Sequence, residues 1–220
     1  MDEITIRRST PSDLDAIMEV YDKARSFMRR SDNLTQWVNG YPSRRLVEED
    51  ITAGCGYVGT DQEGRVVMAF AFIIGPDPTY ADIDGAWLDD EAPYGTIHRL
   101  GSDGTHVGML RACVDWCAAQ CANLRLDTHA DNRPMRRGVS RLGFTRCGII
   151  RCMDGTPRIP TAAPLHSRRC LLIACQRPFR IIILTRVRNN ISKNGVPAKM
   201  HIVSEICNRL KKHRVCFYYI

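Results

Sequence analysis

Two histidines are the side chains best suited to acid–base chemistry in this chain of 220 residues. His98 lies in the predicted strand Tyr94–Leu100, and His129 lies near the end of the predicted strand Leu124–Ala130. A neutral imidazole can take the proton of an ammonium group, directly or through water, because its pKa lies near neutral pH. We predict that His98 and His129 are candidate catalytic bases. The alternative for each is a structural histidine that only bonds a neighbour.

Further polar residues accompany His129. Strand alternation puts Asp127 and His129 on one face, and sites in α/β sheets form where strands end. Asn132 follows with Pro134 close behind, which is the pattern of a helix N-cap. We expect this amide to cap the next helix, and a ligand contact is compatible with that role.

The loop Gly101–Gly108 joins the predicted strand Tyr94–Leu100 to a predicted helix, Met109–Cys121. The first N–H groups of a helix have no partners within the helix, and the helix dipole adds positive charge there. A glycine-containing loop that leads into such an end is typical of an anion site. The segment therefore predicts a phosphate-binding site.

The remaining patterns predict an α/β fold. The predicted strands outside this segment are Glu3–Arg8, Cys55–Thr60, Arg65–Ile74 and Thr145–Ile150, and the predicted helices are 13–30, Arg44–Ala53 and a last one that begins near Asn132 and ends before Phe144. The early strands favour an antiparallel meander, and the later strand–helix–strand units favour parallel pairing. The result is a mixed sheet with helices on both faces.

This order of elements resembles the GCN5-related N-acetyltransferase (GNAT) superfamily over roughly residues 3–159. The resemblance rests on the strand–loop–helix at Thr96–Cys121 and on the pattern from Asp131 to Phe144, which closes with Leu142-Gly143-Phe144. It implies a three-layer α/β/α sandwich around a mixed, mostly antiparallel sheet of about six or seven strands. It also implies that acetyl-CoA lies beside a splayed central strand and that an amine attacks its thioester directly.

The resemblance implies residues for the coenzyme site. The strand would offer His98, Arg99 and Leu100 to the pantetheine arm, and Asn132 would face that arm from the next helix. The loop and helix start would hold the pyrophosphate with Val107, Gly108, Met109, Leu110 and Arg111, with added charge from His106.

Two positions depart from the family pattern. Leu110 stands where the family has a second small residue, so a side chain is present where backbone is expected to approach phosphate. Val139 stands where many members carry a tyrosine that protonates the leaving thiolate, and Gly138 beside it weakens the helix by up to about 1 kcal/mol. These departures leave a non-catalytic acyl-CoA-binding protein as the alternative to an enzyme.

Two other groups of residues have competing interpretations. Cys113, Cys117 and Cys121 have a spacing that suggests a metal or redox site, but together with Leu110 and Val114 they form one apolar helical stripe, which favours buried thiols. Three aromatic residues, Trp37, Tyr41 and Trp87, could shape a pocket for a cationic amine, lined by the acids Asp82, Asp84, Asp89, Asp90 and Glu91. A small hydrophobic core beneath a solvated acidic loop is the favoured interpretation.

Charge divides the chain into two parts. Residues 161–220 hold twelve Lys/Arg and one acid, whereas residues 1–160 hold nineteen basic and twenty-three acidic residues. We therefore predict a GNAT-like domain at 1–160 and a basic tail at 161–220. The tail is either an arm for nucleic acid or an anionic surface, or a stretch with no evolved role. Its lack of periodicity favours the second.

The sequence thus predicts an acyltransferase that acetylates a primary amine of a small molecule or peptide, with acetyl-CoA as cosubstrate and no metal. The absence of a signal peptide or an apolar membrane span, and cysteine spacings without a paired motif, favour a cytoplasmic protein with reduced thiols. Its expected partners are acetyl-CoA and the amine acceptor. The acidic domain argues against nucleic acid, and a monomer or homodimer is expected.

Overall fold

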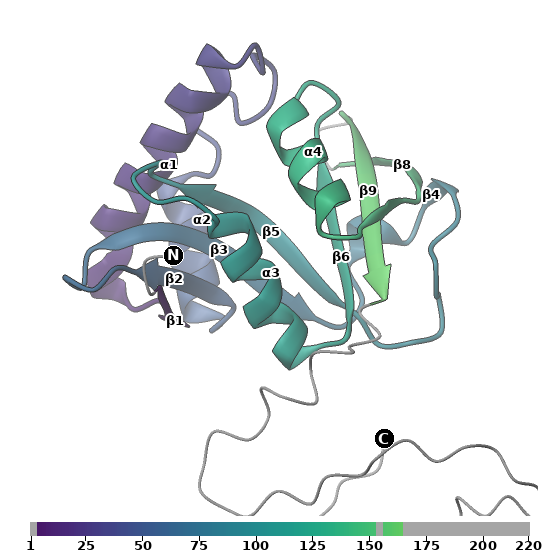
Figure 1. Cartoon of the computed structure of the whole chain (residues 1–220), viewed down its shortest axis with the longest axis horizontal. Coiled ribbons are helices and arrows are strands. Elements are labelled where there is room, and N and C mark those ends of the chain that lie inside the picture. The colour runs from purple at the N-terminus through teal and green to yellow at the C-terminus, as the bar shows by residue number, and fades with distance from the viewer. Residues whose placement is uncertain (1–3, 153–155, 165–220) are drawn as a thin grey trace, which may run out of the picture. The chain divides into compact units, whose positions relative to one another are not determined.

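The computed structural model describes residues 4–152 and 156–164 (Figure 1). Its middle layer is a mixed sheet of nine strands in the order β1-β2-β3-β5-β6-β9-β8-β4, with β7 paired to β9. The strands are β1 (Thr5–Arg8), β2 (Gly56–Thr60), β3 (Val66–Ile74), β4 (Ile83–Gly85), β5 (Gly95–Ser102), β6 (Asn123–Thr128), β7 (Thr145–Arg146), β8 (Gly148–Arg151) and β9 (Pro157–Pro164). The predicted α/β sandwich is confirmed.

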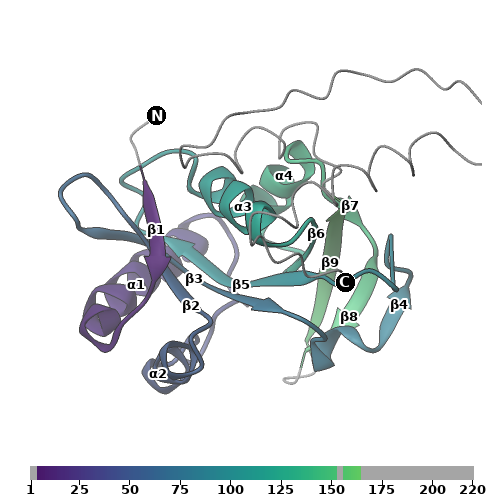
Figure 2. The same cartoon turned by 90° about the horizontal axis from the view of Figure 1, so that it is seen from below.

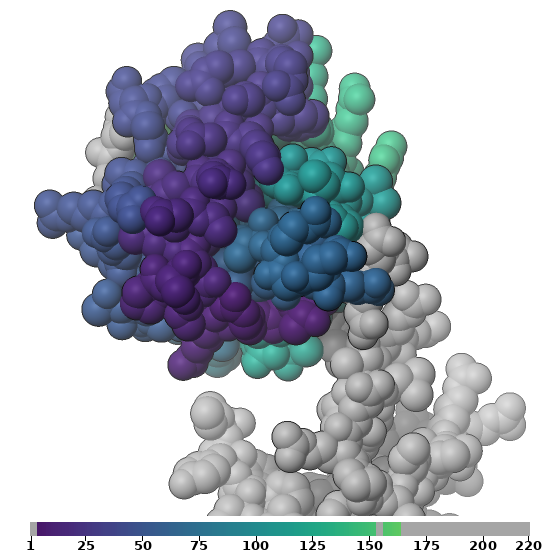
Figure 3. All heavy atoms as spheres, turned by 90° about the vertical axis from the view of Figure 1, so that its left-hand side faces the viewer, coloured from purple at the N-terminus to yellow at the C-terminus, as the bar shows by residue number. Residues whose placement is uncertain are grey.

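Helices cover both faces of the sheet (Figure 2). On one face lie α1 (Leu14–Arg30) and α2 (Arg44–Thr52), and on the other lie α3 (Met109–Gln120) and α4 (Arg133–Arg141). Short 3-10 helices cover Pro11–Asp13 and Pro78–Tyr80. On the face shown in Figure 3, the N-terminal part of the chain (purple) runs as a band from top to bottom, and later segments (blue and teal) lie beside it.

Three hydrophobic cores hold these layers together. The α3–α4 core includes Phe70 and Leu124 from the sheet, and the α1–α2 core includes Val20 and Val58. A smaller core lies around Tyr80, next to the acidic loop before β5. The apolar faces of the helices pack against the sheet in these cores. Burial of this apolar area holds the strands and helices in place.

The cysteines of α3 lie on the apolar side of the helix, as the sequence predicted. Cys113 and Cys117 are fully buried in the α3–α4 core, and Cys121 packs against its edge. The interpretation as packed thiols is confirmed for this helix. Burial raises the pKa of Cys113 well above its ordinary value, so that this thiol stays protonated at neutral pH.

The central strands β5 and β6 separate soon after they meet. They are parallel and pair only at Gly95↔Leu124 and Thr96↔Arg125 within the described residues. β5 then continues to Ser102 along β3, and a bulge falls in β5 between His98 and Gly101. The edge of β5 that faces β6 is therefore open from Ile97 onward.

The sequence missed two strands and one pairing. β4 and β9 were not predicted, and β9 lies between β6 and β8, antiparallel to β6. The expected parallel pair between β6 and the strand after α4 is therefore wrong, because β9 occupies that edge. The early antiparallel meander, β1 to β3, is confirmed.

β9 extends to Pro164, past the predicted boundary at 160, and Thr161 donates to the carbonyl of Leu126 at 3.3 Å. The rest of the predicted tail lies outside the described residues. Within the described ranges, none of the helices has the length and apolar character that a membrane crossing requires.

Candidate functional site

His98 lies on β5 just beyond the point where β6 departs, and it pairs with a carboxylate. Its Nε2 lies 2.5 Å from Oδ2 of Asp77, and both side chains are largely buried. An ionised carboxylate only accepts hydrogen bonds, so Nε2 is the nitrogen that carries the proton. Nδ1 then has a free lone pair when the ring is neutral, and no described residue bonds it. This arrangement suits a general base.

The carboxylate of Asp77 is held in its ionised form. Burial alone would raise the pKa of Asp77, but hydrogen bonds from His98 and Thr79 outweigh burial and lower the pKa to about 2. Because this pKa lies below the ordinary value, the contact stabilises the fold above about pH 4, and the stabilisation is lost as the pH falls towards 2. Asp77 therefore keeps His98 oriented throughout the neutral range.

A second polar pair lies next to His98. The hydroxyl of Tyr80 donates to Oδ1 of Asp127 at 2.9 Å, and the rings of Tyr80 and His98 are 6.0 Å apart. Burial and the charge of Asp127 raise the pKa of Tyr80 well above its ordinary value. The phenol thus stays protonated at neutral pH. Through this hydrogen bond and the ring contact, Tyr80 connects Asp127 of β6 to His98 of β5.

His129 follows β6 and contacts a different part of the chain. Its ring nitrogens lie 3.2–3.3 Å from the hydroxyl of Thr35, and Nδ1 lies 3.4 Å from a carboxylate oxygen of Asp131. Thr35 belongs to the segment between α1 and α2. The structure therefore places His129 in a small polar network that joins this segment to the turn before α4.

Arg99 directs its side chain away from the expected coenzyme arm. Its φ of 55° lies in the left-handed region, and its guanidinium makes two hydrogen bonds to Asp50 of α2, at 2.7 and 3.0 Å. Leu100 turns to the opposite face and packs on the α3–α4 core. Only the backbone of these two residues is available to a ligand at the open edge.

The loop before α3 keeps its predicted form. Gly108 is the N-cap of α3 with a φ of 84°, which favours glycine, and no side chain caps this helix end. Val107 is 82 % exposed, while Met109 is buried in the α3–α4 core. His106 bonds Thr105, and Arg111 lies 3.8 Å from Asp115. No side-chain cap covers the N–H groups of the first turn, so they remain available to an anion, as the prediction requires.

The structure explains the unexpected leucine in this turn. A Cβ added at Gly138 of α4 would lie 2.5 Å from Cδ2 of Leu110. The side chain of Leu110 thus occupies space that glycine leaves at the contact of α3 with α4. It lies against α4, and Gly138 is what makes room for it. The departure at Leu110 is thus accommodated by Gly138, the residue that precedes Val139.

This contact predicts a coupling between the two residues. Alanine normally stabilises a helix by up to about 1 kcal/mol relative to glycine. We expect Gly138→Ala to give none of this gain in the natural chain, because Leu110 must move. In a Leu110→Ala background, we expect the same substitution to raise the free energy of unfolding by about 1 kcal/mol. Urea denaturation of the four variants measures the coupling, and an equal effect of Gly138→Ala in both backgrounds would contradict it.

Asn132 is the predicted cap, and it also bonds the segment between α1 and α2. Its Oδ1 accepts from the backbone N–H of Met135 at 3.1 Å, and its Nδ2 donates to Oε1 of Gln36 at 3.0 Å. Each polar atom of the Asn132 side chain thus has one partner within the chain.

Val139, at the position of the family's tyrosine, is buried in the α3–α4 core.

The aromatic residues of the irregular segments are mainly structural. Trp37 packs edge-on against Tyr21 in the α1–α2 core, and Trp87 packs on Tyr80. The guanidinium of Arg125 lies between the rings of Trp87 and Tyr94, 4.0 and 3.8 Å from their centroids. Burial of Trp37 and Trp87 confirms the small-core interpretation for both.

Sequence reasoning missed four residues of this region. They are Asp77, Tyr80, Thr35 and Gln36. Asp77 precedes Pro78 and caps a 3-10 helix, a local pattern that the sequence does contain. Its pairing with His98 spans 21 residues and had no sequence signal. The structure brings His98, Asp77, Tyr80 and Asp127 together and places His129 in a separate network.

The structure resembles solved acetyltransferases. A GNAT-family acetyltransferase from Streptococcus agalactiae 2603 is 28% identical, with a TM-score of 0.64 over 72% of this chain and 94% of that chain. Another, from Listeria monocytogenes 4b F2365, is 18% identical, with a TM-score of 0.54 over 73% and 95%. No protein-family model and no curated protein sequence matches the chain. The chain therefore has the fold of the GCN5-related N-acetyltransferase superfamily.

Proposed function

We propose that this protein is an N-acetyltransferase that moves an acetyl group from acetyl-CoA directly to a primary amine of a small molecule or peptide. The observation that carries the proposal is the open edge of β5, which begins beyond Thr96 and leads to the N-terminus of α3. A strand edge of this kind offers backbone groups to an extended arm, and the helix end offers N–H groups to a pyrophosphate.

The residues present suit such a ligand. The hydroxyl of Thr128, at the end of β6, is buried and has no hydrogen-bond partner among the described residues. A buried hydroxyl without a partner costs free energy, so a polar ligand group at this position would stabilise it. The hydroxyl of Thr96, on β5, is in the same situation. Thr96 lies where β5 and β6 still pair, so the hydroxyl of Thr128 is the one that supports a polar ligand beyond the point of separation.

Each part of the chain has a role in the proposed reaction. When bound, the coenzyme supplies the acetyl group as a thioester. Backbone N–H groups of β5 around Arg99 and Leu100 would polarise the thioester carbonyl. His98, oriented by Asp77, would take the ammonium proton of the acceptor on Nδ1, directly or through one water. Holding both reactants at one strand edge supplies proximity.

The leaving thiolate has no proton donor at the family position, because Val139 carries no hydroxyl. This feature is the reason to keep a second candidate function, a non-catalytic acyl-CoA-binding protein. The two functions share the coenzyme site and differ only in turnover.

Calorimetry and a thiol-release assay test the proposal together. Acetyl-CoA is titrated into the full chain, and thiol release is then followed with a panel of small amines and peptides. Binding with turnover on at least one amine supports the acetyltransferase. Binding without turnover across the panel supports the second candidate. No binding at millimolar acetyl-CoA would refute both.

A further inference from the structure

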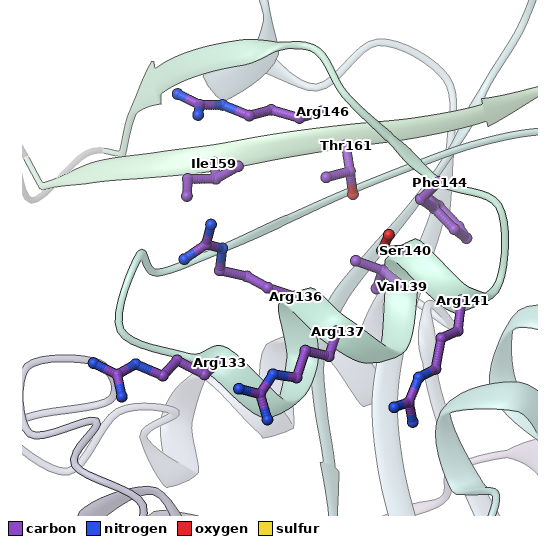
Figure 4. Close-up of a pocket in the computed structure, with 10 residues that line it drawn as sticks. All are labelled: Arg133, Arg136, Arg137, Val139, Ser140, Arg141, Phe144, Arg146, Ile159 and Thr161. Atoms are coloured by element: carbon purple, nitrogen blue, oxygen red, sulfur yellow. The ribbon is translucent and has the colours of Figure 1, made fainter.

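A large cavity lies between α4 and the strands β7 and β9, away from the open edge of β5 (Figure 4). Its volume is about 630 Å³, within the range of small-molecule sites. The residues that line it are Arg133, Arg136, Arg137, Val139, Ser140, Arg141, Phe144, Arg146, Ile159 and Thr161. We call it the arginine cavity. None of the residues expected to hold acetyl-CoA lines it.

Five exposed arginines line this cavity. Four of them belong to α4, which has nine residues and no acid, and the fifth, Arg146, comes from β7 across the cavity. In Figure 4, Arg136 extends from α4 towards β9, where Ile159 lies. Arg137 and Arg141 extend away from β9 in the same view. The cavity is thus lined by arginines of both α4 and β7, but they do not enclose it.

These arginines lack acidic partners. Elsewhere in the domain, arginines such as Arg7, Arg65 and Arg99 each lie within 2.8 Å of a carboxylate. In the parts of the chain that the structure describes, none of the five arginines of the cavity has a carboxylate within 4.0 Å. One of them, Arg136, donates to the backbone carbonyl of Ala130 at 3.0 Å. The positive charge of the cavity is thus not neutralised from within.

The arrangement is unfavourable for the helix itself. Arg133 stands in the first turn of α4, where the helix dipole disfavours a cation. The pairs Arg133/Arg137 and Arg137/Arg141 place like charges four residues apart, which destabilises a short helix by a few tenths of a kcal/mol per pair. Folding therefore gives no reason for this concentration of charge, whereas an anion bound in the cavity would offset the repulsion.

The walls also indicate the kind of anion. Arginine binds phosphate through two parallel N–H donors, and the hydroxyls of Ser140 and Thr161 add polar groups. Val139, Phe144 and Ile159 supply apolar surface. A nucleic-acid backbone instead requires a basic path along an extended surface. Here the arginines line a single cavity of about 630 Å³ that is open to solvent. This volume is typical of small-molecule sites, which favours a compact ligand.

We propose that the arginine cavity is a second binding site, separate from the acetyl-CoA site, for a small molecule with linked phosphate groups. The shared chemistry is a di- or triphosphate anion, either free or attached to a nucleoside. α4 contacts α3 through Gly138 and Leu110, and neither of these residues lines the cavity. The residues expected to hold the pyrophosphate do not line it either.

Calorimetry on the full chain tests this site with inorganic tripolyphosphate and with ATP as probes. Both titrations are repeated in the presence of saturating acetyl-CoA. We expect one site that persists when acetyl-CoA is present. Tighter binding of ATP than of tripolyphosphate would identify a nucleotide, and equal binding would identify the phosphate chain as the recognised part. Loss of the probe signal in saturating acetyl-CoA would overturn a separate site.

A matched pair of variants locates the binding. The double variant Arg133→Gln/Arg146→Gln removes one charge from each wall, and we expect it to weaken probe binding by about tenfold or more. The control Arg29→Gln/Arg30→Gln removes the same charge from exposed positions in the last turn of α1. Equal weakening in both variants would show non-specific attraction and refute the site. The site would also be refuted if a single-stranded oligonucleotide bound more tightly than either probe. Acetyl-CoA binding of all variants is measured in parallel, so failure of the proposed function is detected separately.

Discussion

Replacing His98 with glutamine is expected to lower kcat by roughly 10²–10⁴-fold, the usual contribution of a general base. Glutamine keeps a donor for Asp77 and a similar volume, but it cannot take a proton. The loss should appear in kcat, because the role proposed for His98 is to take the proton of the bound amine. Steady-state thiol release with the best acceptor from the amine panel measures it, together with calorimetry to verify that acetyl-CoA still binds.

Two further variants separate the role of His98 from that of its neighbours. Asp77→Asn removes the charge that orients the ring, and we expect a smaller loss together with a shifted pH profile of kcat/KM. His129→Gln breaks the contacts with Thr35 and Asp131, and we expect kcat to fall less than about tenfold, since His129 lies in a separate network. Full activity of the His98→Gln protein would remove His98 from the mechanism. A larger loss in His129→Gln would transfer the role of base to His129.

The largest expected loss of stability comes from Asp50→Ala. Asp50 and Arg99 form a bidentate ion pair whose side chains are only 12 % and 11 % exposed. Removing one partner leaves the other charge buried and unpaired, which costs about 3–5 kcal/mol. We therefore expect the free energy of unfolding to fall by that amount, measured by urea denaturation.

An exposed ion pair on the same helix is the control. Glu49 lies 2.9 Å from Arg45, and both side chains are largely exposed. We expect Glu49→Ala to cost less than about 0.5 kcal/mol. In the double variant Asp50→Ala/Arg99→Met, no charge remains buried, so much of the stability should return. A loss in Asp50→Ala no larger than that in Glu49→Ala would show that Arg99 reaches solvent when its partner is removed.

The fold could be predicted where one local pattern dominates. The stripe of apolar residues in α1 and the β-rich run Val66–Ile74 have no competing signal, and both formed as expected. β9 was missed because Pro157, Pro160 and Pro164 argue against a strand, since proline has no N–H for the ladder. The structure uses the acceptor that proline retains, because the carbonyl of Pro160 accepts from the N–H of Cys147 at 3.0 Å. Strand pairings between distant segments supply what local propensity does not.

The candidate site could be predicted only in its local parts. His98 and the start of α3 follow from one continuous segment, and Gly108 has the conformation that the loop required. The partner Asp77 and the left-handed backbone of Arg99 arise from tertiary contacts that no spacing reveals. The same holds for Leu110. The space that its side chain occupies depends on a residue 28 positions later, Gly138, and a family pattern read one position at a time does not include that pair.

The three cores described above have a practical consequence for spectroscopy. The chain has three tryptophans, and each lies in or against a different core. Trp37 belongs to the α1–α2 core, Trp116 packs against the α3–α4 core, and Trp87 lies in the small core beside Arg125. Each core of the domain thus has one intrinsic fluorophore in it or against it. The indole emission of single-tryptophan chains can therefore follow the solvation of each core separately, without an added label.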